Sequence, residues 1–136
     1  MEHTSFSKSV KEEIATNDIE SLAKKRALLA GYIRINGSLL IRNKRSILVL
    51  PSENAKISKY IYELLADVYK ADVHIDFIKR KTRVTYQVSV LSKSELILED
   101  LDISFLEGKI SKSIVYDDDT IAGYLAGIFL ATGSIN

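Results

Sequence analysis

The chain has 136 residues, of which 46% are hydrophobic and 27% are charged, and its net charge is +1. This length and composition suit one folded domain with a hydrophobic core, and they exclude a disordered chain. The absence of cysteine excludes a disulfide scaffold and a cysteine-ligated zinc site, and two histidines argue against a histidine-rich metal site. We therefore expect no cofactor.

The charges are distributed unevenly along the chain. Residues 1–21 carry −3, residues 22–90 carry +9, and residues 91–136 carry −5. A basic middle segment indicates a polyanionic partner, although a mixed solvated surface gives the same count. The polar N-terminus lacks the apolar core of a signal peptide, and no apolar stretch approaches the ~20 residues that span a bilayer. We expect a cytoplasmic protein without a membrane partner.

Helices are predicted at the start of the chain. An apolar residue at every fourth position predicts an N-terminal helix within residues 1–19, and a second apolar pattern predicts a helix over 20–36. Gly37 is expected to end that helix in the left-handed conformation.

Two hairpins separated by a helix follow. Each hairpin is a pair of β-rich runs joined by a basic turn, and Pro51 is expected to close the first. In the last strand, apolar residues alternate with polar ones, which predicts one apolar face. The predicted elements are strands 38–41 and 46–50, helix 53–70, strands 73–78 and 83–90, and helix 93–101.

The final helix is the most apolar part of the chain. Residues 102–116 give no clear pattern, and Asp117–Asp119 place acids where a helix N-terminus favours them. The helix predicted at 120–132 is apolar on nearly every side, so it must be buried against another element. The overall order predicts an α+β fold.

Two segments of the sequence match each other. Residues 29–39 and 125–135 share Leu-Ala-Gly and Gly-Ser at the same spacing, 96 residues apart. Five matched positions favour duplication over chance. Small residues let two helix backbones approach closely, so we expect these two helices to pack on each other. The candidate interface residues are Ala30, Gly31, Ile35, Ala126, Gly127 and Leu130.

These segments resemble the LAGLIDADG signature of homing endonucleases. The resemblance implies an αββαββα repeat whose sheet lies over the DNA major groove, with two signature helices packed about a pseudo-twofold axis. In that family an acid directly before Gly-Ser binds the divalent cation. Here those positions hold Asn36 and Thr132, which supply no anionic oxygen. We therefore expect a degenerate homing endonuclease that holds no metal and is not an enzyme.

A closer resemblance is to the N-terminal part of the WhiA family of bacterial sporulation and cell-division transcription regulators. In that family a LAGLIDADG-like domain without catalysis precedes a helix-turn-helix domain. The resemblance rests on Ser5–Ser7, Val10–Glu13, residues 26–39, Glu53–Ile57 and residues 127–136.

The WhiA resemblance also implies a domain organisation. Residues 1–19 would form an N-terminal helix, 20–116 a first LAGLIDADG-like repeat, and 117–136 the start of a second repeat. A helix-turn-helix domain is absent, so the chain resembles a truncated member. The resemblance implies a cytoplasmic, nucleoid-associated bacterial protein.

Double-stranded DNA is the expected partner. Basic residues gather at both predicted hairpins, where a β-ribbon that enters a groove carries its cations. Charged turns also keep sheet edges soluble, so a protein-interaction or dimerisation module remains the alternative, with self-association through the signature helices or binding of other regulatory proteins. A residual metal-dependent DNA endonuclease is the less favoured alternative. The candidate DNA-binding residues are Arg42, Lys44, Arg45, Lys79, Arg80, Lys81, Arg83, Thr85 and Gln87.

Overall fold

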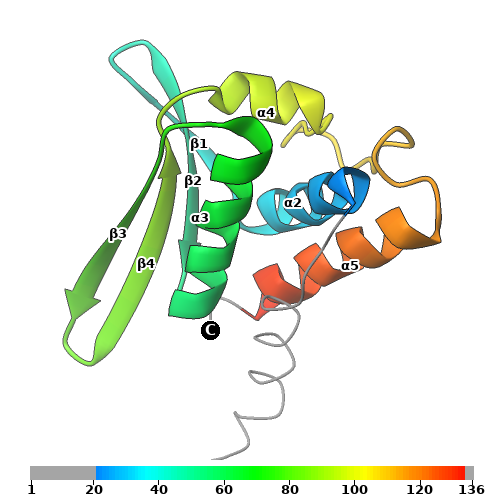
Figure 1. Cartoon of the computed structure of the whole chain (residues 1–136). Coiled ribbons are helices and arrows are strands. Elements are labelled where there is room, and N and C mark those ends of the chain that lie inside the picture. Colours follow the sequence, from blue (N-terminus) through cyan, green and yellow to red (C-terminus); the bar gives the residue numbers. More distant parts are fainter. Residues whose placement is uncertain (1–20, 134–136) are drawn as a thin grey trace, which may run out of the picture.

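The computed structural model describes residues 21–133 as an antiparallel sheet with helices on one of its faces (Figure 1). The predicted N-terminal helix at 1–19 lies outside the described residues. The expected α+β class and the order αββαββα are confirmed. The elements are α2 (Leu22–Asn36), β1 (Ser38–Arg42), β2 (Arg45–Ser52), α3 (Ala55–Tyr69), β3 (Val73–Arg80), β4 (Arg83–Val90), α4 (Ser94–Asp100) and α5 (Asp118–Thr132).

Side-chain caps fix where three of these helices begin. Ser21, Asn54 and Asp117 each accept a hydrogen bond from a backbone N–H in the first turn of α2, α3 and α5. The Thr120 hydroxyl oxygen accepts a hydrogen bond from the backbone N–H of Asp117, which completes a capping box. The acids expected at the start of the last helix therefore serve as its cap and face its positive end.

The sheet order is β1-β2-β4-β3, so β1 and β3 are the edges. Both hairpins have two-residue turns, Asn43-Lys44 and Lys81-Thr82, which hold three residues at positive φ. The prediction that Pro51 closes the first hairpin is wrong, because β2 continues to Ser52 and Pro51 lies opposite Gln87. Pro51 is tolerated because β1 pairs only as far as Val49, so its missing N–H faces an open edge.

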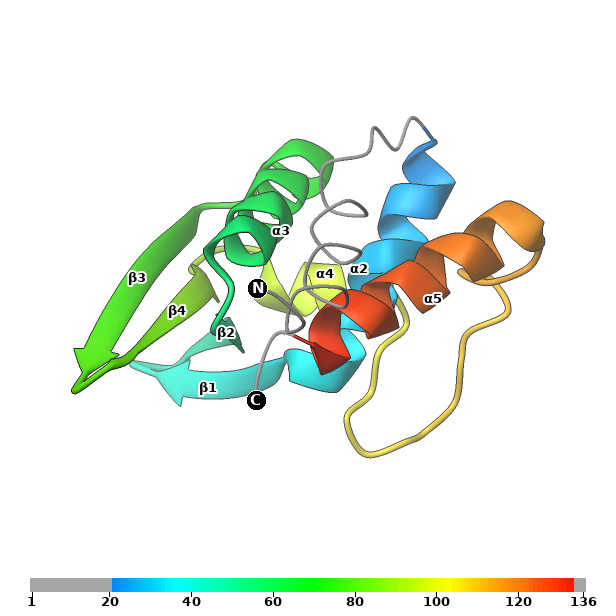
Figure 2. The same ribbon diagram turned by 90° about the horizontal axis from the view of Figure 1, so that it is seen from below.

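The core lies between the sheet and the helices. Leu48, Leu50, Val88 and Val90 project from the central strands and are buried. Helix α3 packs across β2, β3 and β4, and α2 packs beside α3. Figure 2 shows α5 on the side of α2 away from α3. Within the described residues, no helix is both long and apolar enough to cross a membrane.

Helices α2 and α5 pack through their backbones. A Cβ atom added to Gly31 would lie 2.4 Å from the carbonyl oxygen of Tyr124, and one added to Gly127 would lie 2.1 Å from that of Leu28. These two contacts are related by the 96-residue repeat, because Gly31 corresponds to Gly127 and Leu28 to Tyr124. The reciprocity is that of a pseudo-twofold interface.

The contact between α2 and α5 includes Gly123 in addition to predicted interface residues. A Cβ atom on Gly123 would lie 2.7 Å from the carbonyl oxygen of Lys24. Ala30 and Leu130 are buried, and Ala126 packs against the core at partial burial. Ile35 differs from the expectation: it keeps 47% of its surface exposed because it lies one turn beyond the Gly31 contact.

Gly37 is needed for a reason other than the one predicted. Its backbone is extended, with φ −79° and ψ 147°, and no glycine in the described part of the chain has positive φ. A Cβ atom at this position would lie 2.5 Å from the carbonyl oxygen of Ile33. Glycine is therefore required for close approach to the end of α2 rather than for left-handed geometry.

Alanine at Gly31 or Gly127 should destabilise the fold. Neither contacting oxygen belongs to a flexible side chain, so the helices must separate to admit a methyl group. We expect Gly31→Ala and Gly127→Ala each to lower the free energy of unfolding by at least about 2 kcal/mol, measured by denaturant titration. Gly108→Ala is the matched control: nothing lies within 4 Å of its added Cβ, and it should change stability by less than about 0.5 kcal/mol. Equal effects at all three positions would contradict the packing account.

Candidate nucleic-acid interface

Among residues 21–133, the helices leave one face of the sheet uncovered, and strand register assigns side chains to it. Residues paired across strands share a face, and neighbours along a strand alternate. Buried Leu48, Leu50, Val88 and Val90 mark the helix-covered face, while Val49 is buried on the other face. The side chains of opposite parity therefore lie on the open face, and they include Arg42, Arg45, Arg80, Arg83, Thr85 and Gln87.

Each hairpin ends in a pair of arginines directly opposite each other. Arg42 pairs with Arg45 at the end of the first hairpin, and Arg80 with Arg83 at the end of the second. Like charges opposed across two strands are unfavourable without a counter-charge. This arrangement produces two concentrated positive sites on one surface.

The two arginine pairs lie at opposite ends of the sheet. Because β2 and β4 are antiparallel, with Ser52 opposite Tyr86, the turn before β2 points away from the turn before β4 (Figure 1). From Arg45 the path follows β2 to Ser52, crosses to Tyr86 and continues along β4 to Arg83. It advances ten residues, or ~33 Å at the rise of an extended strand. Thr85 and Gln87 lie between the ends, on β4.

The remaining candidate cations occupy different surroundings. Lys44 and Lys81 are in the two turns, both at positive φ. Lys79 pairs with Val84 and therefore lies on the opposite face from the arginines. Within the described part of the chain, neither these lysines nor Arg42, Arg45 and Arg80 form an ion pair.

Two acidic residues and one histidine lie on or beside the open face and lower its positive charge or add polar groups there. Arg83 Nη2 lies 3.5 Å from Glu53 Oε2, so this arginine already has a carboxylate partner. Asp76 lies opposite Gln87 on the same face. His74 is exposed and lies 3.3 Å from Asp72, which fits a solvent-facing strand histidine rather than a metal ligand.

The positions that would need metal-binding acids lie at the ends of α2 and α5. Asn36 ends α2, and its side-chain nitrogen is buried without a hydrogen-bond partner among the described residues. Thr132 ends α5, and its hydroxyl donates to the carbonyl oxygen of Phe129. Neither side chain supplies the anionic oxygen that a Mg²⁺ site prefers. Within residues 21–133, no cluster of three His, Cys, Asp or Glu side chains is placed to hold a metal.

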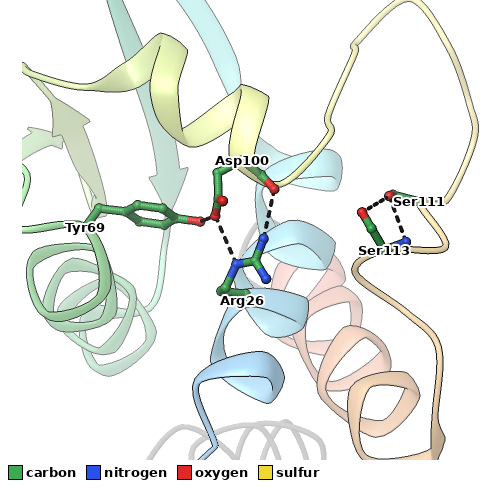
Figure 3. A network of polar contacts seen from close by, with 5 residues as sticks. All are labelled: Arg26, Tyr69, Asp100, Ser111 and Ser113. Carbon is green, nitrogen blue, oxygen red and sulfur yellow. Dashed lines mark hydrogen bonds and ion pairs between the residues drawn. The ribbon is translucent and has the colours of Figure 1, made fainter.

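A polar network that the sequence analysis missed connects three helices (Figure 3). Arg26 of α2 donates to the Asp100 carboxylate at 2.9 Å and to the Asp100 carbonyl oxygen at 3.0 Å. Tyr69 of α3 donates to the same carboxylate at 2.6 Å. These residues are 31 to 74 positions apart, so no local pattern signals the network.

The electrostatics of the network favour a structural role. Burial raises the pKa of the Tyr69 hydroxyl, and its hydrogen bond to Asp100 raises it further. Burial alone would raise the pKa of Asp100, but hydrogen bonds from Tyr69 and Arg26 outweigh it and hold that pKa below its ordinary value. Tyr69 therefore stays neutral and Asp100 stays charged near neutral pH, so neither is tuned for proton transfer.

Arg34 and the segment after α4 contact each other. Its guanidinium donates to the carbonyl oxygen of Glu107. The same segment contains Ser111, whose hydroxyl lies 2.8 Å from that of Ser113 (Figure 3), and Ile114, which is buried. The segment therefore folds back on the helices although it forms neither helix nor strand.

Comparison with known proteins identifies the family. The family model described as the WhiA N-terminal LAGLIDADG-like domain matches residues 22–104. The chain belongs to this family. Its sequence is 34% identical to a probable cell division protein WhiA of Enterococcus faecalis and 38% identical to one of Streptococcus mutans. These alignments include 97% and 96% of this chain but 44% of each relative, so the chain spans less than half of their length.

Solved structures show the WhiA-type fold. A crystal structure of the N-terminal LAGLIDADG domain of WhiA matches with a TM-score of 0.70 and 19% identity, over 96% of this chain and 59% of that one. The structure of I-DmoI in complex with DNA and Mn matches with a TM-score of 0.53 and 15% identity, over 82% of this chain and 63% of that one. At these identities the likeness concerns the fold alone.

The Asp100 network should make stability depend on acid pH. A carboxylate with a depressed folded-state pKa stabilises the fold above its unfolded pKa, near 3.8, and that stabilisation is lost as pH falls through the folded value. We expect the unfolding free energy of the natural chain to fall more steeply below about pH 4 than that of Asp100→Asn. Denaturant titrations at several pH values measure this. Parallel pH curves for the two proteins would contradict it.

Proposed function

We propose that this chain is a non-catalytic, LAGLIDADG-like DNA-binding domain of a WhiA-type regulator of transcription. Its relatives are named as cell division proteins, and we place its role in the control of sporulation and cell division in the bacterial cytoplasm, at the nucleoid. The observation that carries the proposal is the open sheet face, which presents an arginine pair at each end.

The dimensions of that face suit one turn of duplex DNA. The arginine pairs are ~33 Å apart along the strands, and one turn of B-DNA is about 34–36 Å long. A sheet that follows the major groove would bring each pair to phosphates at one end of the contact. Phosphates would also relieve the repulsion within each pair. Thr85 and Gln87, between the ends, would face base edges, for which hydroxyl and amide groups are suited.

The proposed domain binds without cleaving. Cleavage would need anionic oxygen ligands at the helix ends, where Asn36 and Thr132 are neutral. Asn36 can offer a cation only the neutral oxygen of its side-chain amide, and its side-chain nitrogen is buried without a hydrogen-bond partner among the described residues. A duplex incubated with the protein and Mg²⁺ should therefore remain intact, and specific cleavage would overturn this part of the proposal.

A salt-dependent DNA titration tests the interface. We expect log affinity for duplex DNA to fall linearly with log salt. Replacing Arg45 and Arg80 together by glutamine should reduce the slope by about two units and weaken binding at least about tenfold at ~50 mM salt, because each arginine neutralises one phosphate.

The control for this titration removes the same charge elsewhere. Lys109 and Lys112 are exposed in the segment after α4, and Lys109→Gln with Lys112→Gln should leave the slope and affinity unchanged. Failure of the natural chain to bind duplex DNA at ~50 mM salt would refute the proposal for this domain.

We further propose that α5 begins a second repeat. Ile121, Leu125 and Phe129 form a stripe along α5 with 43%, 58% and 37% of their surface exposed. The repeat relates Leu125 and Phe129 to Leu29 and Ile33 of α2, which are fully buried in the first repeat. A second sheet and helix placed by the same pseudo-twofold axis would cover the stripe.

The substitution Leu125→Glu tests whether a following segment covers the apolar stripe of α5. In the 136-residue chain this change should alter the free energy of unfolding by less than about 0.5 kcal/mol. In a longer chain that includes the segment following this region in the relatives, it should cost at least about 2 kcal/mol, because a charge would be buried. Chemical denaturation of both chains measures the difference. An effect of the same size in both would contradict the second repeat.

A further inference from the structure

The second hairpin carries an aromatic pair on the face away from the arginines. Phe77 of β3 lies directly opposite Tyr86 of β4, and their ring centroids are 6.5 Å apart at an interplanar angle of 47°. Both rings share the helix-covered face with Val73 and Val90, as strand alternation requires. This tilted geometry is favourable for two aromatic rings, so the pair forms a defined platform.

The helical layer stops short of this platform. Along β3, Val73 is 8% exposed, whereas Phe77 on the same face is 68% exposed. Figure 1 shows the reason: the tip of the β3–β4 hairpin extends past the end of α3. The apolar face of the sheet therefore continues into solvent beyond the element that covers it.

The charge around the platform is positive. Lys79 lies on the same face as Phe77, opposite Val84 in the next row. Lys81 occupies the adjoining turn. Within the described residues, neither lysine has an ion-pair partner. An apolar surface with uncompensated lysines at its rim favours an acidic ligand.

We propose that this surface, defined by Phe77, Lys79, Val84 and Tyr86, binds an acidic, apolar segment of a partner protein. The segment would be extended, because β3 is an edge strand whose outer backbone groups pair with no other strand of the described residues. An added strand satisfies those groups, its apolar side chains cover the rings, and its carboxylates reach Lys79 and Lys81. Buried aromatic anchors dominate the affinity of such contacts.

The proposal is independent of DNA binding. Phe77 and Arg80 lie on opposite faces of the same strand, so a duplex on the arginine face leaves the platform uncovered. Two partners could thus occupy one hairpin together. The alternative is that this surface binds no partner. Single exposed phenylalanines are common, and lysines on an edge strand discourage pairing with other strands. That alternative predicts no binding.

Peptide titration followed by NMR decides between the two. The probe is an eight-residue peptide with phenylalanine, valine and glutamate at alternate positions and threonine between them, so that its apolar and acidic side chains share the face of Phe77 and Lys79. It is added to the isotope-labelled chain, and the matched probe has lysine in place of glutamate. We expect the acidic peptide to shift the resonances of Phe77, Lys79, Val84 and Tyr86, with and without bound duplex DNA. The basic peptide should not. No shift at this surface up to ~1 mM peptide, or equal binding of both peptides, would overturn the proposal.

Variants test which side chains carry the contact. Phe77→Ser should weaken the acidic peptide at least about tenfold, as loss of a central aromatic anchor does. Lys79→Glu should abolish binding of the acidic peptide and permit the basic one. Phe105→Ser is the matched control, because Phe105 is also exposed but lies outside the hairpin, and it should have no effect. Binding that survives Phe77→Ser undiminished would refute the assignment.

Discussion

The glycines at 31 and 127 bring α2 and α5 so close that backbone carbonyl oxygens occupy the space where a methyl group would stand. Close contact over several turns gives many small dispersion contacts that a wider helix spacing would lose. It also fixes the direction of α2, and the rest of the first repeat follows from α2. The helix contributes seven buried residues, and β1 leaves its end after only Gly37. The orientation of the sheet is therefore set by a helix pair that lies outside it.

A fixed sheet permits its open face to carry unfavourable charge. Arg42 opposite Arg45 weakens the strand pair to which it belongs, whereas Arg83, opposite Arg80, has a counter-charge in Glu53. Both arginine pairs are the last of their hairpins, where strand pairing ends, whereas buried apolar pairs such as Leu50 opposite Val88 lie under the helices. The charge repulsion therefore lies away from the hydrophobic core and affects its stability least. The anionic partner proposed above would bring negative charge to both hairpin ends.

Strand alternation and the repeat were the reliable signals in the sequence. The alternation in residues 83–90 assigned faces without reference to any other element, and the matched Leu-Ala-Gly segments indicated which two helices pack together. The placement of the hairpins at opposite ends of the sheet was not predictable, because it depends on the pairing of β2 with β4 across an intervening helix. The network of Arg26, Tyr69 and Asp100 is non-local for the same reason. Gly37 was recognised as a helix end, but the close carbonyl of Ile33 that requires glycine appears only in three dimensions.

The alternation of side chains along β3 separates basic residues that are neighbours in the sequence. Lys79, Arg80 and Lys81 read as one basic cluster, yet register sends Arg80 to the open face, Lys79 to the helix side and Lys81 to the turn. A helix of the same composition would have spread these charges around its circumference. A strand divides them between two surfaces that face away from each other, and the helices cover only part of one. The hairpin beyond α3 thus has two faces of different chemistry that the described helices do not cover, a polar one with arginines and an aromatic one with lysines. A short edge hairpin can in this way address two kinds of partner without any change in conformation.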